Sequence, residues 1–274
     1  MSRNAGAGFD RLVEYIEEEM EFATSHYNDA YLDRRIGARM RRTGHDEYGA
    51  YRRLLAEDDG EREALLDALS INVTGFFRNP EVWERLRAVL RGLSDRRRRV
   101  RVWSAPCADG REPYSLAMLA LDDDGVDAGR VEVTATDIDR EALATAREGV
   151  YHTTRTTRIE EELRPLDGVD RYVEREDDRF RVREAVRDLV TFERHDLIRG
   201  EARGPFDLVC CRNLFIYIDR EYKEPVTETV TESLRPGGYL ALGKTETLPR
   251  THEDAYDPVA KPLRIYRRAG GDRD

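Results

Sequence analysis

The sequence predicts an α/β fold in which a small all-helical domain precedes a mostly parallel, doubly wound sheet. Apolar residues recur at helical spacing through residues 9–75, and no strand pattern interrupts them. From Val100 onward, short apolar strands alternate with helical stretches, as in a parallel sheet with crossover helices. Three of these strands end abruptly in polar residues, and such sheets bind ligands at the carboxyl ends of their strands.

The helical region is expected to form about four amphipathic helices. Its apolar stripes are Phe9, Leu12, Val13 and Ile16; Tyr31, Leu32, Ile36 and Met40; Tyr48, Tyr51, Leu54 and Leu55; and Leu65, Leu66 and Leu69. We assign residues 1–78 to this helical domain, residues 79–99 to a linker helix, and residues 100–274 to the second domain.

The second domain is expected to hold parallel strands, an edge strand and an antiparallel insertion. The parallel strands are expected at about 100–105, 131–136, 189–193, 206–211 and 238–243, and the edge strand at 262–267. Residues 171–183 alternate with period two around an acidic turn, which predicts a hairpin in a small β-subdomain at about 168–188.

The composition excludes several classes of protein. The net charge of -10 argues against a nucleic-acid partner, because phosphates must be met by an excess of Lys and Arg. The three cysteines show no zinc-site spacing, so no metal is expected. The longest apolar run is far shorter than the roughly 20 residues that span a bilayer, and the N-terminus has no apolar signal segment. The sequence therefore predicts a cytoplasmic protein without membrane insertion.

The loop after the first expected strand, residues 105–110, narrows the choice of cofactor. Its glycine, Gly110, stands alone, without a G-x-G-x-x-G pattern or a P-loop lysine. A dinucleotide or a nucleoside triphosphate is therefore disfavoured. The remaining common ligand at this place in such a sheet is S-adenosylmethionine, which has no phosphate.

Two acids end the second and third strands. Asp137 stands where a carboxylate can accept from both ribose hydroxyls, and Asp139 is the better N-cap for the following helix, so we favour ligand binding for Asp137. Asp196 is placed either to accept from the adenine amine or to cap a turn, and the sequence leaves both open.

Five ordered segments carry a resemblance to a known family. They are Ser70-Ile-Asn-Val-Thr-Gly-Phe-Phe-Arg-Asn-Pro80, Trp103-Ser-Ala-Pro-Cys-Ala-Asp-Gly-Arg-Glu-Pro-Tyr-Ser115, Thr136-Asp-Ile-Asp139 with Ala146-Arg-Glu-Gly-Val-Tyr151, Phe206-Asp-Leu-Val-Cys-Cys-Arg-Asn-Leu-Phe-Ile-Tyr217, and Leu234-Arg-Pro-Gly-Gly238. In these segments the chain resembles the CheR family of chemotaxis-receptor glutamate methyltransferases, and the similarity covers nearly the whole chain.

The resemblance implies a Rossmann-like class I domain that depends on S-adenosylmethionine, with a small antiparallel β-subdomain, after a helical domain. It implies methyl transfer to receptor glutamates, which leaves S-adenosylhomocysteine. The cofactor-binding residues that it implies are Asn72, Thr74, Arg78, Glu112, Asp137, Asp196, Leu197, Asn213 and Leu214. The chain departs from the family at Arg111, because many members carry Glu-Glu or Gln-Glu where this chain has Arg111-Glu112.

The chemistry of such a transfer suits these residue types. The acceptor carboxylate is ionised at neutral pH, with a reference pKa near ~4.3, so no general base is needed. The protein must align carboxylate, methyl and sulfur, and positioning of this kind supplies roughly 7–11 kcal/mol. Arg78 is suited to grip the methionine carboxylate as a two-pronged donor. Tyr217 either donates its hydroxyl to the acceptor glutamate or packs as a core aromatic, and we assign Tyr217 and Arg78 as the catalytic residues.

An arginine cluster is expected to dock the substrate. Residues 33–53 contain seven Arg and three acids in an otherwise acidic chain, and Arg35, Arg39 and Arg42 share one helix face. The family is thought to dock its receptor near this domain, so the cytoplasmic helical region of chemotaxis receptors is the predicted partner. The acidic turn at 176–178 is short and lacks glycine, which predicts no tight tether to a receptor's C-terminal pentapeptide.

Two alternatives remain open. One is a methyltransferase that acts on another substrate. The other is a receptor-associated adaptor that binds S-adenosylmethionine without turnover, for which Arg111 is the only hint in the sequence.

Overall fold

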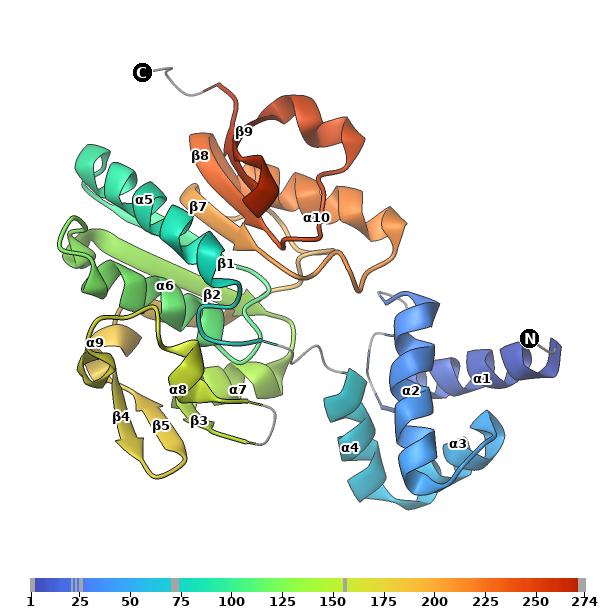
Figure 1. Cartoon of the computed structure of the whole chain (residues 1–274). Helices are drawn as coiled ribbons and strands as arrows, with labels where there is room; N and C mark the ends of the chain where they lie inside the picture. The colour runs from blue at the N-terminus through green and yellow to red at the C-terminus, as the bar shows by residue number, and fades with distance from the viewer. Residues whose placement is uncertain are drawn as a thin grey trace. The chain divides into compact units, whose positions relative to one another are not determined.

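The computed structural model describes residues 3–20, 22, 24, 27–69, 74–154 and 157–270 (Figure 1). The chain divides into two units, each with its own hydrophobic core. Unit 1 comprises Met1–Asn72 and Tyr217–Tyr222, and unit 2 comprises Val73–Ile216 and Lys223–Asp274.

Unit 1 contains the predicted helical domain. Its helices are α1 (Arg3–Glu19), α2 (Asp29–Thr43), α3 (Tyr48–Glu57) and α4 (Asp59–Leu69). Helix α2 begins after Asn28, whose side chain accepts a hydrogen bond from the Tyr31 amide, and ends at Gly44 in the left-handed conformation. The predicted stripes supply the core, in which Leu12, Ile16 and Ile36 are almost completely buried.

A short segment from far along the chain completes the core of unit 1. The carbonyl of Tyr217 accepts hydrogen bonds from both the backbone amide and the side-chain amide of Asn28, each at 3.0 Å. The ring of Tyr217 packs edge-on against Tyr31, with the ring centroids 5.0 Å apart. Local sequence patterns gave no sign of this long-range contact.

Unit 2 is built on a sheet with strand order β6-β2-β1-β7-β8-β10-β9. Neighbours from β6 to β8 are parallel, and β10 is antiparallel to both β8 and β9. The strands are β1 (Val100–Ser104), β2 (Val131–Asp137), β6 (Val190–Arg194), β7 (Phe206–Cys211), β8 (Leu234–Leu242), β9 (Tyr256–Ala260) and β10 (Ile265–Arg268). This sheet confirms the predicted doubly wound α/β fold.

The predicted edge strand at 262–267 is wrong in one respect. Strand β10, which covers the second half of this range, lies between β8 and β9, and the edge strand is β9. The sequence of β9 contains Pro258, which weakens a strand pattern. Proline is tolerated in an edge strand because such a strand has only one neighbour, so the missing N–H donor is not needed on the other side.

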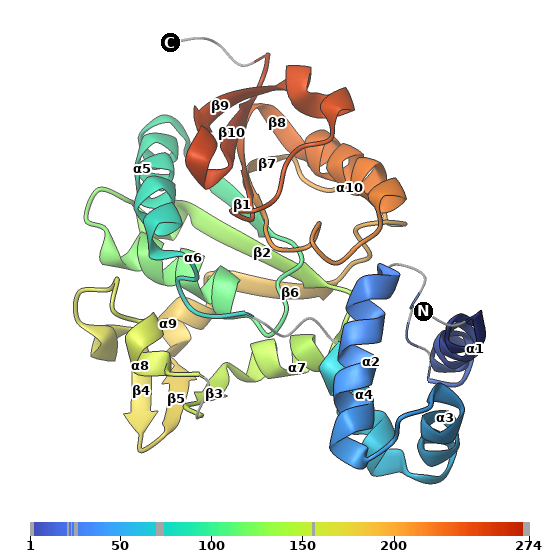
Figure 2. The same ribbon diagram turned by 45° about the vertical axis from the view of Figure 1, so that its right-hand side comes forward.

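Helices cover both faces of the sheet (Figure 2), with α5 and α6 on one side and α10 on the other. The helices of unit 2 are α5 (Pro80–Arg96), α6 (Arg111–Asp122), α7 (Arg140–Glu148), α8 (Ile159–Glu162), α9 (Glu184–Arg187) and α10 (Arg220–Ser233), with short 3₁₀ turns at Ala128–Arg130, Val169–Arg171, Arg250–Ala255 and Lys261–Leu263. Helix α5 lies in the range expected as a linker, and its Trp83, Leu86 and Leu90 are part of the unit 2 core.

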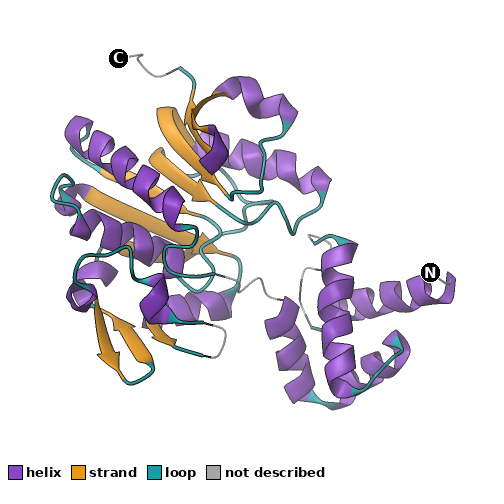
Figure 3. Ribbon diagram, in the orientation of Figure 1, coloured by secondary structure: helices purple, strands orange, loops and turns teal. Residues whose placement is uncertain are grey.

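The predicted hairpin is present in a separate small sheet, which Figure 3 shows apart from the main sheet. Its order is β3-β5-β4, from β3 (Val150–His152), β4 (Val173–Glu176) and β5 (Arg179–Val182). Strand β3 was not predicted, because three residues are too few to show alternation. In the described part of the chain, no helix has both the length and the apolar character that a membrane span requires.

Candidate cofactor site

Three strand ends meet at one edge of the main sheet. Strand β1 pairs in parallel with β2 on one side and with β7 on the other, so that Ser104 lies opposite both Ala135 and Cys210. The loop after β1 is bound to both neighbours, because the Ala105 amide donates to the Cys210 carbonyl and the Cys107 amide donates to the Thr136 carbonyl. The polar groups that follow these strands therefore share one edge, as the sequence predicts.

Gly110 ends the loop and permits a close approach of two helices. Its φ of 90° lies in the left-handed region. A Cβ there would lie 2.8 Å from the Cβ of Ala146 in α7, which is closer than real Cβ contacts. The glycine therefore allows α6 to begin against α7.

Asp137 is buried and held by two backbone amides. Its Oδ2 accepts from Ala108 at 2.7 Å, and its Oδ1 accepts from Asp139 at 3.0 Å. Asp139 caps α7 by accepting from the amides of Glu141 and Ala142, so capping does not explain Asp137. Burial raises the pKa of Asp137 to about 6, although the amide hydrogen bonds act in the opposite direction.

Glu112 and Arg212 form an ion pair at the same edge. The Glu112 carboxylate accepts from the Ser104 hydroxyl at 2.9 Å and lies 3.1 Å from Nη1 of Arg212. Burial raises the pKa of Glu112, and the charge of Arg212 opposes that shift. The Arg212 side chain, only 1% exposed, also donates from Nη2 to the Arg78 carbonyl at 2.9 Å and lies over the Trp83 ring.

Arg212 was not predicted as a site residue. The sequence showed only that the apolar run of β7 stops at this arginine. Its contacts join the end of β7, the first turn of α6 and the loop before α5. A charged residue directly after a fully buried strand was the available signal.

Asn213 and Leu214 follow Arg212, and a buried carboxylate fixes their backbone. Asn213 has a positive φ of 61°. Glu246, 2% exposed, accepts from the amides of Asn213 at 2.8 Å, Phe215 at 2.6 Å and Gly243 at 2.6 Å. Glu246 was not predicted, because nothing in its local sequence shows that its partners are backbone groups of another loop.

Three more of the predicted cofactor residues precede α5 in the sequence. Thr74 and Arg78 are half-buried, whereas Asn72 lies outside the described residues. A pocket of about 480 Å³ is lined by the segment before α5, residues 74–80, together with Arg158, Glu161 and Glu162.

Asp196 adopts the capping arrangement that the sequence left open. Its Oδ1 accepts from the amides of Ile198 at 2.8 Å and Arg199 at 3.2 Å. Leu197 beside it is largely buried. A contact between Asp196 and adenine stays a prediction.

The predicted docking arginines of α2 differ in their surroundings. Arg39 forms an ion pair with the buried Glu61, with Nε 3.0 Å from Oε1, and Tyr51 also donates to this carboxylate. Arg35 lies over the Tyr31 ring, and Arg42 is exposed. Arg39 therefore has a structural contact inside unit 1 that the helical spacing did not reveal.

Among the described residues, no three side chains of His, Cys, Asp or Glu are grouped closely enough to hold a metal ion. Cys107, Cys210 and Cys211 are all buried and unpaired in disulfides, and burial raises the pKa of each thiol.

Comparison with known proteins places the chain in a family. Residues 72–264 match the family described as "CheR methyltransferase, SAM binding domain", and residues 7–70 match "CheR methyltransferase, all-alpha domain". The chain is 32% identical to a chemotaxis protein methyltransferase of Listeria monocytogenes over 85% of this chain and 87% of that protein. It is 32% identical to that of Escherichia coli over 88% and 84%, and 31% identical to chemotaxis protein methyltransferase 1 of Pseudomonas aeruginosa over 96% and 98%. The chain belongs to the CheR methyltransferase family, with a Rossmann-like SAM-binding domain in unit 2.

Proposed function

We propose that the protein transfers a methyl group from S-adenosylmethionine to glutamate side chains of chemotaxis receptors, forming glutamyl methyl esters. The observation that carries this proposal is the meeting of the ends of β1, β2 and β7 at one edge of a SAM-binding domain. The relatives that cover most of the chain are named chemotaxis protein methyltransferases, which supports the substrate class.

The residues present at this edge fit the cofactor. Asp137 supplies a carboxylate for the ribose hydroxyls, and its two amide hydrogen bonds hold it in place. The exposed side chain of Ile138 offers an apolar surface beside Asp137 on which an adenine ring can pack. Glu112 and Asp137 would add carboxylates near the positive sulfonium and ammonium of the bound cofactor, with the charge of Glu112 partly compensated by Arg212.

The remaining proposed contacts are divided between the methionine part and the adenine of the cofactor. We assign Thr74 and Arg78 to it, together with Asn72, and Asn213 with Leu214 to the same region. Asp196 and Leu197 are assigned to the adenine. Bound S-adenosylmethionine supplies an electrophilic methyl group, and the acceptor glutamate is already ionised. The protein's own side chains therefore orient the two reactants and exclude water, and they do not need to remove a proton.

A transfer assay tests the proposal. Purified protein is incubated with receptor-containing membranes and methyl-tritiated S-adenosylmethionine. We expect base-labile radioactivity in the receptor band, since methyl esters hydrolyse in base. Cofactor binding without transfer would instead support the adaptor alternative, and label in another fraction would support another substrate.

Cofactor affinity is expected to depend on pH through Asp137. The carboxylate must be ionised to accept from two hydroxyls, and its pKa in the free protein is about 6. The dissociation constant of S-adenosylhomocysteine should therefore rise as the pH falls from 7 to 5, approaching about tenfold per pH unit below 6.

Titration calorimetry between pH 5 and pH 8 measures this dependence. Asp137→Asn is the control and should bind weakly with no comparable slope. The raised pKa of Asp137 affects folding stability in the opposite direction. A carboxyl whose pKa is higher in the folded state increases the free energy of unfolding at low pH, and this contribution is lost as the pH rises through about 6. A dissociation constant that is flat across this range would exclude the role of Asp137.

Tyr217→Phe is expected to lower the turnover number and to leave the affinity for S-adenosylhomocysteine unchanged. The substitution keeps the ring that packs against Tyr31 and removes only the hydroxyl, so it separates the two roles left open for this residue. Single-turnover rates and calorimetry measure the two quantities. An unchanged turnover number would assign Tyr217 to the core of unit 1 alone.

Arg42→Glu is expected to raise the Michaelis constant for receptor about three- to tenfold, because it reverses an exposed charge on the face proposed for docking. Affinity for S-adenosylhomocysteine should not change. Arg11→Glu, an exposed reversal on α1, is the matched control. Arg39→Glu is unsuitable because it would place two carboxylates together at Glu61. Equal Michaelis constants for Arg42→Glu and wild type would contradict docking by this face.

A further inference from the structure

We propose that Arg111 and Glu162 are a positioning pair, which holds the backbone of Phe76 and thereby the segment that carries Arg78. This inference rests on the proposed function, because it gives the pair a role in the cofactor site. It assigns Arg111 to a contact within the protein and not to a contact with the cofactor.

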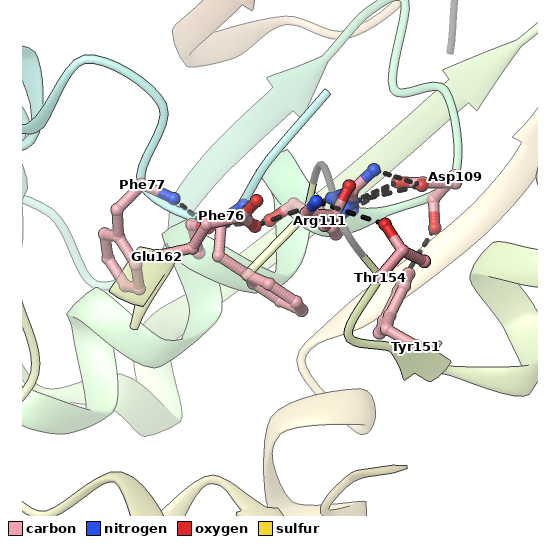
Figure 4. Close-up of polar contacts among 9 residues, drawn as sticks. Phe76, Phe77, Asp109, Arg111, Tyr151, Thr154 and Glu162 are labelled. Atoms are coloured by element: carbon pink, nitrogen blue, oxygen red, sulfur yellow. Dashed lines mark hydrogen bonds and ion pairs between the residues drawn. The ribbon is translucent and has the colours of Figure 1, made fainter. Parts of the chain in front are cut away.

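The guanidinium of Arg111 is buried between two carboxylates (Figure 4). Its Nη2 lies 3.0 Å from Oδ2 of Asp109, and its Nη1 lies 3.5 Å from Oε2 of Glu162. It also lies over the ring of Tyr151, whose hydroxyl donates to the Asp109 carbonyl at 2.6 Å. These contacts come from the loop before α6, from β3 and from α8, and together they fix the orientation of Arg111.

Glu162 transmits this constraint to the segment before α5. The same oxygen that faces Arg111 accepts a hydrogen bond from the Phe76 amide at 2.8 Å. A Cβ on the preceding residue, Gly75, would lie 3.3 Å from each of the three carboxyl atoms of Glu162. The glycine therefore leaves room for the backbone to approach this carboxylate.

The backbone of Arg111 is also connected, through Ser115, to the amide of Phe77. The Phe77 amide donates to the Ser115 hydroxyl at 3.0 Å, and this hydroxyl donates to the Arg111 carbonyl at 2.6 Å. Phe77 has a φ of 47°, which is unfavourable for an aromatic residue and persists only where the surroundings enforce it. The amides of Phe76 and Phe77, the two residues before Arg78, are thus both held by contacts that lead back to Arg111.

The charges around Glu162 explain why an arginine is needed here. Burial and the charge of Asp109 raise the pKa of Glu162, whereas the Phe76 amide and Arg111 lower it. Three other charged residues line the pocket: Arg158 and Glu161 are paired with each other at 3.0 Å, and Arg78 belongs to the segment before α5 itself. Without Arg111, Glu162 and Asp109 would lack their shared cation, and Glu162 would shift toward its protonated form, a weaker acceptor for Phe76.

A double-mutant cycle tests the pair by calorimetry with S-adenosylhomocysteine. Arg111→Gln and Glu162→Gln are each expected to raise the dissociation constant about tenfold. The double variant should be within about twofold of either single variant, because both act through one amide. Arg111→Lys keeps the charge and should restore affinity to within about threefold of wild type.

Arg91→Gln is the matched control. It removes an arginine from the buried Asp123, 2.7 Å away at the opposite end of α6, and should lower stability without changing the dissociation constant. Should Arg111→Gln not fold, Glu162→Gln carries the test alone, since its side chain is 23% exposed.

Three results would overturn the positioning pair. They are unchanged affinity in both single variants, loss in Arg111→Gln without loss in Glu162→Gln, and losses that multiply in the double variant. The second of these would make Arg111 a direct cofactor contact. A wild-type protein that does not bind S-adenosylhomocysteine would refute the proposed function itself, and this result differs from a loss confined to the variants.

Discussion

Arg212→Met is expected to lower the free energy of unfolding of unit 2 by about 3–5 kcal/mol, the cost of removing one partner from a buried ion pair. Methionine fills much of the space but leaves the Ser104 hydroxyl as the one hydrogen-bond donor to Glu112 among the described residues. It also removes one of two donors to the Arg78 carbonyl and leaves the indole of Trp83 as the other, so the affinity for S-adenosylhomocysteine should fall as well.

Urea denaturation followed by tryptophan fluorescence measures the change in unit 2 alone. Both tryptophans of the chain, Trp83 and Trp103, lie in the core of that unit. The double variant Arg212→Met with Glu112→Gln should recover part of the stability, because no uncompensated carboxylate remains, but it should not recover cofactor binding. A loss below about 1 kcal/mol in the single variant would show that Glu112 is not dependent on Arg212.

The strands of the sheet were predictable because buried parallel strands are nearly continuous apolar runs. β1, β2, β6 and β7 lie within one residue of the predicted ranges. β9 escaped prediction because its pattern is interrupted by Pro258, and β3 because it is short. The position of the candidate site could also be predicted, because the carboxyl ends of parallel strands lie at the same edge of a sheet.

The contacts that fix the site were harder to predict, since they join side chains to backbone groups of distant segments. Glu162 and Glu246 both accept from main-chain amides, which have no signature in the sequence. Arg39 lies on a polar helix face, and only the packing of α4 brings Glu61 to it. The role of Tyr217 stays a prediction, because its place in unit 1 depends on a non-local contact with Asn28 that no local pattern reveals.

Gly243→Ala is expected to lower the free energy of unfolding of unit 2 by about 3 kcal/mol and to weaken binding of S-adenosylhomocysteine more than tenfold. A Cβ at this position would lie 2.4 Å from Oε2 of Glu246 and 2.8 Å from the amide nitrogen of Asn213. The carboxylate would have to move, and the amides of Asn213, Phe215 and Gly243 would lose their common acceptor.

The matched control for this substitution is Gly92→Ala in α5, where the added Cβ meets only the end of the Arg96 side chain. Since alanine is favoured over glycine inside a helix, this variant should gain roughly 0.5–1 kcal/mol and bind S-adenosylhomocysteine normally. Glu246→Gln keeps the volume but offers one acceptor oxygen in place of two, so it should weaken binding without the steric strain. If Gly243→Ala bound S-adenosylhomocysteine as tightly as wild type, the backbone of Asn213 would not be part of the cofactor site, and its assignment would have to rest on the side chain alone.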